Sequence, residues 1–551
     1  MKEREKRIKE LEQLVLAGAS EQCGALPRIP DIADEECTPL VVDLRGIVYR
    51  ARELVQALRD EIAVLKGEKG RPKIRPSRLE KGDGEKEEET DEEAAPKKRR
   101  GSSKRSKTVE LVIHETVIVA PENLPEGSRF KGGEDFTVQD IRITVHNTVY
   151  RLQRWCTPEG KELVGKLPAG LNGGHFGPEL VRFILYQHHH AGVTQPLLLE
   201  QLEEMGVDIS AGQLSRIITE GKAPFHAEKD DLLRVGLEIS RHVNTDDTGA
   251  RHDGKNGYCT HIGNEVFAWF QSTDSKSRVN FLELLHAGRV DYALNEDAMA
   301  YVREQKLPGR QLERLAAYGK KHFEHKGEWE GALDVLGFTN PRHIRIATEG
   351  ALLGSLLEHP INPELVIISD DAGQFDILRH ALCWIHAERT IRKLIGFSDD
   401  HRQAIEEIRD RIWALYQGLK AYKEAPTEDK KVELEARFDE IFTTKTCDLT
   451  LNDALERIRK NKSELLLVLD RPDIPLHNNL SESDIREYVK KRKISGSTRS
   501  PDGRRCRDTF TSLKKTCRKH GVSFWQYLYD RLCDSRTIPR LSTLMQQAAQ
   551  G

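Results

Sequence analysis

The sequence predicts a multidomain α/β protein in which helical and charged segments precede a core of strands and helices. Two short apolar runs, HVNTDDTG and LVIISDDAG, have the pattern of strands that end in acidic residues. Longer runs with helical periodicity separate and follow them, as in HALCWIHAERTIRKLIG. A chain of 551 residues has room for three or four domains of ordinary size.

Composition excludes several classes of protein. The net charge is −3, and 38% of the residues are hydrophobic while 32% are charged, as in a polar globular protein. The nine cysteines form no CxxC pair, which indicates reduced thiols rather than a disulfide framework or a zinc ribbon. The opening MKEREKRIKE lacks the apolar region of a signal peptide, and no run approaches the roughly 20 apolar residues of a membrane helix. We therefore expect a cytoplasmic protein with no membrane partner.

Residues 1–66 are predicted to form an N-terminal helical and coiled-coil segment. Apolar residues recur every seven positions, with Ile47 and Leu54 at the d positions of the seam. The a positions are Leu44, Ala51, Leu58 and Leu65. Such a seam favours a homo-oligomer, and the alternative is a helix that packs on its own domain.

Residues 67–107 are predicted to be a disordered charged linker. The acidic run EKEEETDEE lies between two basic stretches, and the segment has too few apolar residues to order itself. It is either a solvated tether or an arm that exchanges counterions with DNA phosphates.

Two small domains are expected next. Residues 108–170 alternate apolar and polar side chains, as in DIRITVHNTVYRLQRW, which predicts a small antiparallel sheet. Residues 171–235 contain three helical segments with a Ser cap before the third, the pattern of a helix-turn-helix domain or of a helical hairpin that binds no DNA. The expected DNA contacts are Ser210, Gln213 and Arg216. The consecutive histidines at 188–190 point in different directions on a helix, so we expect them at the surface.

The core is expected to span residues 236–500, with helical insertions at 291–362 and 397–470. Residues 501–551 read as a C-terminal helical segment. The first strand of the core ends in Asp246 and Asp247, and a later strand is followed by Asp370 and Asp371. Strands that end in carboxylates can direct them to one point at the edge of a sheet, where Mg²⁺ could bind. Acidic residues after strands are also common turn and cap residues, and the chemistry alone leaves a choice within each pair.

A later segment, IPLHNNLSESDIREYVKKRKISGS, resembles the transposases of insertion-sequence family sixty-six, whose catalytic Glu begins a helix after an Asn pair. The other two motifs are similar in the same order. One is the Asp-Asp-Thr-Gly that starts at Asp246, and the other is Ser369-Asp370 followed by Cys383-Trp384-Ile385-His386. The resemblance implies a ribonuclease-H-like core whose catalytic and metal-binding residues are Asp246, Asp370 and Glu482. It picks the first Asp of each pair.

The resemblance also implies a function. It predicts DNA strand cleavage and transfer with two Mg²⁺ or Mn²⁺ ions per active site, acting on terminal inverted repeats and on target DNA, in a bacterial nucleoid and with possible accessory proteins. Cys383 and His386 are expected to steady their helix by packing. Basic side chains near the Glu helix are expected to contact phosphates: Arg486, Lys490, Lys491, Arg492, Lys493, Arg504 and Arg505.

Some positions depart from the family pattern. His477 stands where the family has Asp, Ser483 where it has Arg, and Asp247 where it has Glu, and the cysteine cluster that the family carries before the helix-turn-helix is missing. The change at His477 motivates the alternative of a catalytically impaired DNA-binding protein that occupies or represses element ends. A structural coiled-coil adaptor is a third possibility.

Overall fold

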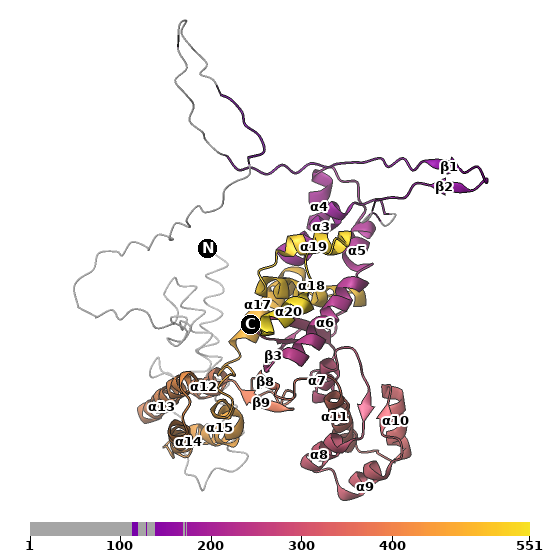
Figure 1. The fold of residues 1–551 in the computed structure, drawn as a ribbon. Helices are drawn as coiled ribbons and strands as arrows, with labels where there is room; N and C mark the ends of the chain where they lie inside the picture. Colours follow the sequence, from indigo (N-terminus) through magenta and orange to yellow (C-terminus); the bar gives the residue numbers. More distant parts are fainter. Residues whose placement is uncertain (1–112, 120–127, 129–137, 169–170, 172–173, 551) are drawn as a thin grey trace, which may run out of the picture. The chain divides into compact units, whose positions relative to one another are not determined.

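The computed structural model describes residues 113–119, 128, 138–168, 171 and 174–550 (Figure 1). The chain divides into two units, Met1–Ile143 and Thr144–Gly551. The coiled coil predicted for 1–66 and the linker predicted for 67–107 lie outside the described residues. In the part of the chain that is described, no helix is long and apolar enough to cross a membrane.

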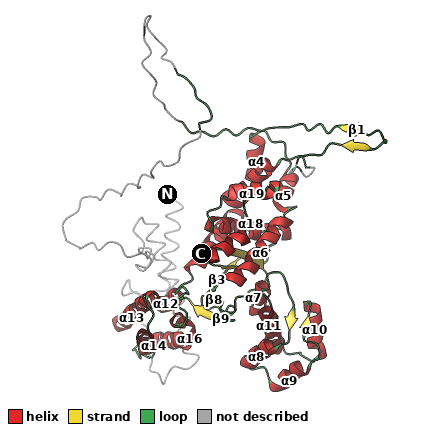
Figure 2. Cartoon of the chain, viewed as in Figure 1, coloured by secondary structure: helices red, strands yellow, loops and turns green. Residues whose placement is uncertain are grey.

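The second unit is a mixed α/β structure that is mostly helical and contains one larger mixed sheet (Figure 2). The five strands of this sheet lie in the order β5-β4-β3-β8-β9. Their bounds are β3 His242–Gly249, β4 Tyr258–Gly263, β5 Ala268–Thr273, β8 Val366–Ser369 and β9 Arg379–Leu382. Strand β3 pairs antiparallel with β4 and parallel with β8, and β8 pairs parallel with β9. The predicted α/β class is confirmed at this level.

Helix α18 (Pro501–Lys519) covers the outer edge of this sheet. The exposed backbone of an edge strand is open to unwanted pairing unless it is covered. Here the backbone N–H groups of alternate β5 residues donate to side chains one turn apart on α18: Ala268 to Thr516 Oγ1 (3.2 Å), Phe270 to Ser512 Oγ (2.9 Å) and Ser272 to Asp508 Oδ2 (2.7 Å). Two strand residues rise about 6.6 Å and four helical residues about 6 Å, so the two spacings match.

Two further helices pack on the sheet. Helix α17 (Asn479–Ser495) lies against β3 and β4, and its Tyr488 stacks on Phe270 of β5 with ring centroids 5.9 Å apart. Helix α6 (Ala223–Ile239) packs against β5. A Cβ atom at Gly236 of α6 would lie 2.6 Å from the Phe267 ring, so this close approach requires glycine.

The two regions predicted to be helical insertions are mostly helical. The first contains α8 Glu296–Glu304, α9 Gly309–Ala317, α10 Lys326–Val335 and α11 Pro341–Glu358, with the two short paired strands β6 Tyr292–Ala293 and β7 His322–Phe323. The second contains α13 Asp399–Glu424, α14 Glu428–Phe442, α15 Leu449–Lys460, α16 Lys462–Leu465 and the 3₁₀ turn η4 Leu467–Leu469. Helices α7 (Arg278–Leu285) and α12 (Trp384–Arg392) connect these regions to the sheet.

The helices before the sheet follow the sequence pattern. They are α3 Pro178–Tyr186, continued by the π-helical turn η3 Gln187–Ala191, then α4 Gln195–Glu204 and α5 Ala211–Thr219. Ser210 caps α5 and forms a capping box with Gln213, as the predicted N-cap requires. Their shared core contains Ile184, Leu198, Leu202, Leu214 and Ile218. The C-terminal segment adds α19 Phe524–Cys533 and α20 Leu541–Gln550.

Two sequence predictions need correction. In the described part of 108–170, the only strands are β1 (Arg154–Cys156) and β2 (Glu162–Val164), which pair antiparallel, and the alternating residues of 138–153 form none. An alternating pattern forms a stable sheet only where another layer buries its apolar side, and Ile141 and Val149 are exposed. The histidines of η3 were predicted at the surface, but His189 is buried and stacks on Phe510.

Candidate active site

Two adjacent parallel strands bring Asp246 and Asp370 to the same region. Asp370 directly follows β8, as predicted, but Asp246 lies within β3, which continues to Gly249 and does not end at the acids as the sequence predicted. In the β3–β8 ladder, His242 pairs with Val366 and Asn244 with Ile368. Continuing this register places Asp246 of β3 beside Asp370, the first residue after β8.

The two neighbouring acids in β3 lie on opposite faces of the sheet, because successive strand side chains alternate. Asp246 pairs across the ladder with His261 and shares its face with Asn244, and both of these residues contact the segment that carries Glu482. Asp247 faces the other way, where it accepts hydrogen bonds from Thr260 Oγ1 (2.5 Å) and Gln374 Nε2 (3.1 Å). The sheet therefore directs Asp246, and not Asp247, toward α17.

Asp370 and Asp371, the two acids after β8, differ in burial and in their hydrogen-bond partners. Asp370 is half-buried, and its Oδ1 atom is buried without a hydrogen-bond partner among the described residues. Asp371 is exposed and accepts a hydrogen bond from Asn461 Nδ2 at 3.2 Å. Of these two acids, only Asp370 is among the main causes of the raised pKa of Asp246.

Glu482 lies in the first turn of α17, and the residue that precedes this helix holds it on the sheet. Asn478 is buried; its Oδ1 accepts from Asn244 Nδ2 at 2.9 Å, and its Nδ2 donates to the Thr245 carbonyl at 2.7 Å. The backbone N–H of Asn478 donates to Cys383 Sγ at 3.2 Å. The Asn478 side chain thus joins the start of α17 to β3, and the Asn478 backbone N–H joins it to Cys383, the residue before α12.

The three carboxylates interact electrostatically. Burial, together with the negative charges of Asp370, Asp247 and Glu482, raises the pKa of Asp246 to about 7, although the hydrogen bond from the Asp247 N–H acts in the opposite direction. The Oε1 atom of Glu482 is buried and accepts no hydrogen bond from the described residues. Concentrated negative charge with unsatisfied oxygens is the environment that a hard divalent cation relieves.

Two cationic or titratable side chains on α12 approach Glu482. His386 Nε2 lies 3.4 Å and Arg389 Nη2 3.6 Å from Glu482 Oε1. Burial lowers the pKa of His386, as does the charge of Arg389, whereas Glu482 and Asp370 raise it. The sequence pattern predicted a packing role for His386 and gave no indication of a role for Arg389. The Cys-Trp-x-His helix directly after the second acidic strand was the signal that could have identified both. Cys383 is buried, as its predicted packing role requires, and Trp384 is buried as well, with its Nε1 donating to the Leu465 carbonyl at 2.8 Å.

A polar cleft extends from Asp370 between α12 and α15. Its walls carry three cationic side chains, Arg389, Lys393 and Arg457. The remaining lining residues include Asp371, Cys383, His386 and Asn461. Positive charge along a groove that begins at a carboxylate cluster suits a nucleic-acid backbone passing beside it.

The basic residues predicted to contact DNA fall into two groups. Four of them are exposed, namely Arg486, Lys490, Lys493 and Arg505. Three of them have intramolecular partners: Lys491 Nζ donates to the His188 carbonyl, Arg492 Nη1 to the Gly249 carbonyl, and Arg504 Nη1 to Asp274 (2.8 Å).

On α5, Arg216 is exposed, whereas Ser210 and Gln213 are engaged with each other in the capping box. DNA contact by these ten residues stays a prediction.

Comparison with known proteins gives two similarities. Residues 366–505, which run from β8 through α17, match the model of the family described as Transposase IS66 family. The uncharacterized protein y4jO of Sinorhizobium fredii is 40% identical to this chain over 317 residues, which are 57% of this chain and 99% of that protein. The match to the family model contains Asp370 and Glu482.

Proposed function

Because this chain belongs to the transposase IS66 family, we propose that it cuts and joins DNA strands at the ends of an insertion sequence, with Asp246, Asp370 and Glu482 as its catalytic residues. The observation that carries the proposal is electrostatic: the charges of Asp370, directly after β8, and of Glu482, in the first turn of α17, both raise the pKa of Asp246 on β3.

Topology supports a ribonuclease-H-like core for this site. Three antiparallel strands followed by two parallel ones, in the order β5-β4-β3-β8-β9, put the first strand of the core at the centre of the sheet. The centre is where an acid on β3 can meet an acid after β8. Helix α17 returns from a long insertion to cover the same face.

The residues fit a pair of Mg²⁺ or Mn²⁺ ions. Asp370 Oδ1 and Glu482 Oε1 are buried oxygens without hydrogen-bond partners among the described residues, and the Asp246 carboxyl is destabilised in its charged form. The ligand set would be Asp246, Asp370 and Glu482, completed by water and phosphate oxygens. When bound, such ions activate the attacking oxygen and stabilise the leaving oxygen of an in-line phosphoryl displacement.

The protein's own groups position this chemistry. Asn478 joins the start of α17, the helix that carries Glu482, to β3, the strand that carries Asp246. His386 and Arg389 lie 3.4 and 3.6 Å from Glu482 Oε1, close enough to orient the carboxylate electrostatically. Arg389, Lys393 and Arg457 line the path for a strand that leaves the site, and a fixed array of charges aligns a phosphate without further reorganisation.

Partners follow from the same proposal. The substrates are the element's terminal inverted repeats and a target DNA. In the proposed helix-turn-helix, α4 and α5 are the hairpin and Arg216 is the exposed cation on the second helix. We further propose that the protein acts as a homo-oligomer on the bacterial nucleoid, with accessory proteins of the element as possible partners.

The test is a cleavage and strand-transfer assay on DNA that carries an element end, with Mg²⁺ or Mn²⁺. Glu482→Ala should abolish cleavage and transfer and leave DNA affinity within about twofold, because Glu482 makes no proposed phosphate contact. Strand transfer retained by Glu482→Ala would contradict the assignment of Glu482 as a catalytic residue. Wild-type protein that binds ends but never cleaves them would favour the alternative, a catalytically impaired protein that occupies or represses element ends.

A further inference from the structure

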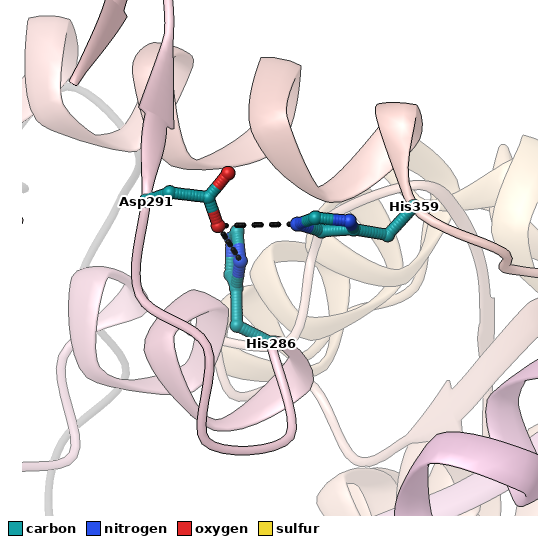
Figure 3. Close-up of side chains that lie close together, drawn as sticks. All are labelled: His286, Asp291 and His359. Atoms are coloured by element: carbon teal, nitrogen blue, oxygen red, sulfur yellow. Dashed lines mark hydrogen bonds and ion pairs between the residues drawn. The ribbon is translucent and has the colours of Figure 1, made fainter. Parts of the chain in front are cut away.

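Two histidines and an aspartate meet where the first helical insertion leaves and rejoins the core. His286 follows α7, Asp291 precedes β6 at the start of the insertion, and His359 follows α11 at its end. Figure 3 shows one oxygen of the Asp291 carboxylate facing both imidazole rings. Asp291 Oδ1 lies 3.1 Å from His359 Nε2 and 3.6 Å from His286 Nδ1, and the three ligand atoms all lie within 4.8 Å of one another.

The hydrogen bonds around His286 leave a lone pair directed at a carboxylate. His286 Nε2 lies 3.0 Å from the Leu352 carbonyl oxygen, an acceptor, so this nitrogen carries the ring proton. The His286 side chain is 0% exposed; burial lowers its pKa and the charge of Asp291 raises it. In the tautomer with the proton on Nε2, Nδ1 faces Asp291 Oδ1 at 3.6 Å with both atoms as acceptors, and Nδ1 has no hydrogen-bond partner among the described residues.

A cation between these atoms resolves the conflict. We propose that His286 Nδ1, Asp291 and His359 Nε2 form a Zn²⁺ site that clips the neck of the insertion. Two ligands bound at 2.0–2.1 Å in a tetrahedral zinc site lie about 3.4 Å apart, between the two distances to Asp291 Oδ1. Imidazole nitrogen favours zinc over Mg²⁺ and Ca²⁺, which prefer oxygen.

The surroundings are those of a prepared metal site. Leu352 O orients His286, and Ser355 Oγ donates to Asp291 Oδ2 at 2.7 Å, so that two ligands have partners on α11 that fix their direction. His286 and His359 also line a pocket whose other walls include Leu285, Leu356, Arg234 and Arg289, so water can reach the two rings. A contrasting cluster, Asp376, His380 and Glu464, has no such conflict, because both ring nitrogens of His380 have partners in Ser369 and Glu464.

The consequence is mechanical. Asp291 and His359 lie at the two ends of the 291–362 insertion, and His286 belongs to the core side. A zinc ion bound by all three joins the insertion to α7 at one point and limits its rotation about the neck. This role is independent of the proposed cleavage chemistry, whose carboxylates lie on other elements.

The experiment measures zinc bound by the full-length protein. EDTA-treated protein is dialysed against Zn²⁺ in excess Mg²⁺, which occupies the carboxylate cluster, and is then passed through gel filtration. Wild type should retain one zinc per chain more than His359→Ala, and zinc should raise the thermal unfolding temperature of wild type only. Ser355→Ala should weaken zinc binding about tenfold or more.

Three controls separate this site from others. His322→Ala removes an exposed histidine of the same insertion, paired with Glu358, and should keep the zinc. Asp370→Asn should also keep it, even if that variant loses all cleavage activity. Wild-type protein that retains no zinc, or His359→Ala protein that retains as much as wild type, would overturn the proposal and leave a metal-free hydrogen-bonded cluster. If His359→Ala does not fold, the unfolding shift and zinc content of Ser355→Ala decide.

Discussion

Asn244 and Asn478 join the strand of the first acid to the helix of the third. Their side chains form a buried hydrogen bond of 2.9 Å between Asn244 Nδ2 and Asn478 Oδ1, across 234 residues of sequence. Asn478 Nδ2 donates a hydrogen bond to the carbonyl of Thr245, the residue before Asp246. The geometry of the candidate site therefore depends on one amide side chain that carries no charge.

Removal of the Asn478 side-chain amide should lower the cleavage rate strongly and the free energy of unfolding only moderately. Asn478→Ala leaves buried polar groups of Asn244 and Thr245 unpaired, at a cost of about 1–3 kcal/mol in the free energy of unfolding. A displacement of Glu482 by about 1 Å would lower the cleavage rate about 100-fold. Asn340→Ala is the matched control, because it removes the N-cap of the remote α11 and costs about 1 kcal/mol without touching the site. Equal cleavage rates in the two variants would contradict a positioning role for Asn478.

The neighbouring acids of β3 should differ sharply when each is replaced. Asp246→Asn should lower the rate of metal-dependent cleavage by about 10³-fold or more, since it removes a charge that faces the other two carboxylates. Asp247→Asn should stay within about tenfold of wild type, because Thr260 and Gln374 already use its oxygens on the other face. Single-turnover cleavage at saturating Mg²⁺ measures both. A larger loss for Asp247→Asn would show that the wrong acid has been chosen.

The cleft beside Asp370 predicts a salt effect. If Lys393 and Arg457 contact phosphates, each replacement by Ala should reduce the slope of log affinity against log salt by about 0.9. Arg459→Ala is the control, because Arg459 is paired with Glu456 and is not part of the cleft wall. Binding of end-containing DNA at several salt concentrations gives the slopes. Identical slopes for all three variants and wild type would show that DNA does not bind along this cleft.

Acid should weaken the contact between α17 and α18. Burial alone would raise the pKa of Asp484, but the nearby His261 ring and the ammonium groups of Lys519 and Lys515, at 3.0 and 2.8 Å, lower it well below its usual range. A carboxylate with a lowered folded-state pKa stabilises the protein above its unfolded pKa of about 3.9, and this contribution is lost as pH falls further.

Asp484→Asn should thus lower the free energy of unfolding by about 3–5 kcal/mol at pH 7, since it leaves two lysines without their buried partner. Below about pH 4 the difference from wild type should shrink. Urea unfolding at pH 7, 5 and 3 measures it. The exposed pair of Asp534 and Arg536 supplies the control, because Asp534→Asn should change stability little at any of these pH values. A constant difference between Asp484→Asn and wild type over this range would argue against the ion-pair explanation.

Local patterns in the sequence were sufficient for the elements whose cause is local. The capping box at Ser210 and the helical insertions follow from rules that act within a few residues. The order of three short acidic motifs was enough to indicate the family. The sheet predicted from the alternating residues of 138–153 was wrong. Alternation indicates which side of a strand would be apolar, but it does not indicate whether another layer covers that side.

The sequence by itself determined the class of fold, the family and the three candidate carboxylates. Only the tertiary structure decided that Asp246 faces α17 while Asp247 does not, that His386 and Arg389 reach Glu482, and that His286, Asp291 and His359 meet at the neck of an insertion. The physical reason is that these contacts join residues far apart in the chain. Their distances depend on which helix packs on which face of the sheet, and no pattern within a few residues encodes that choice.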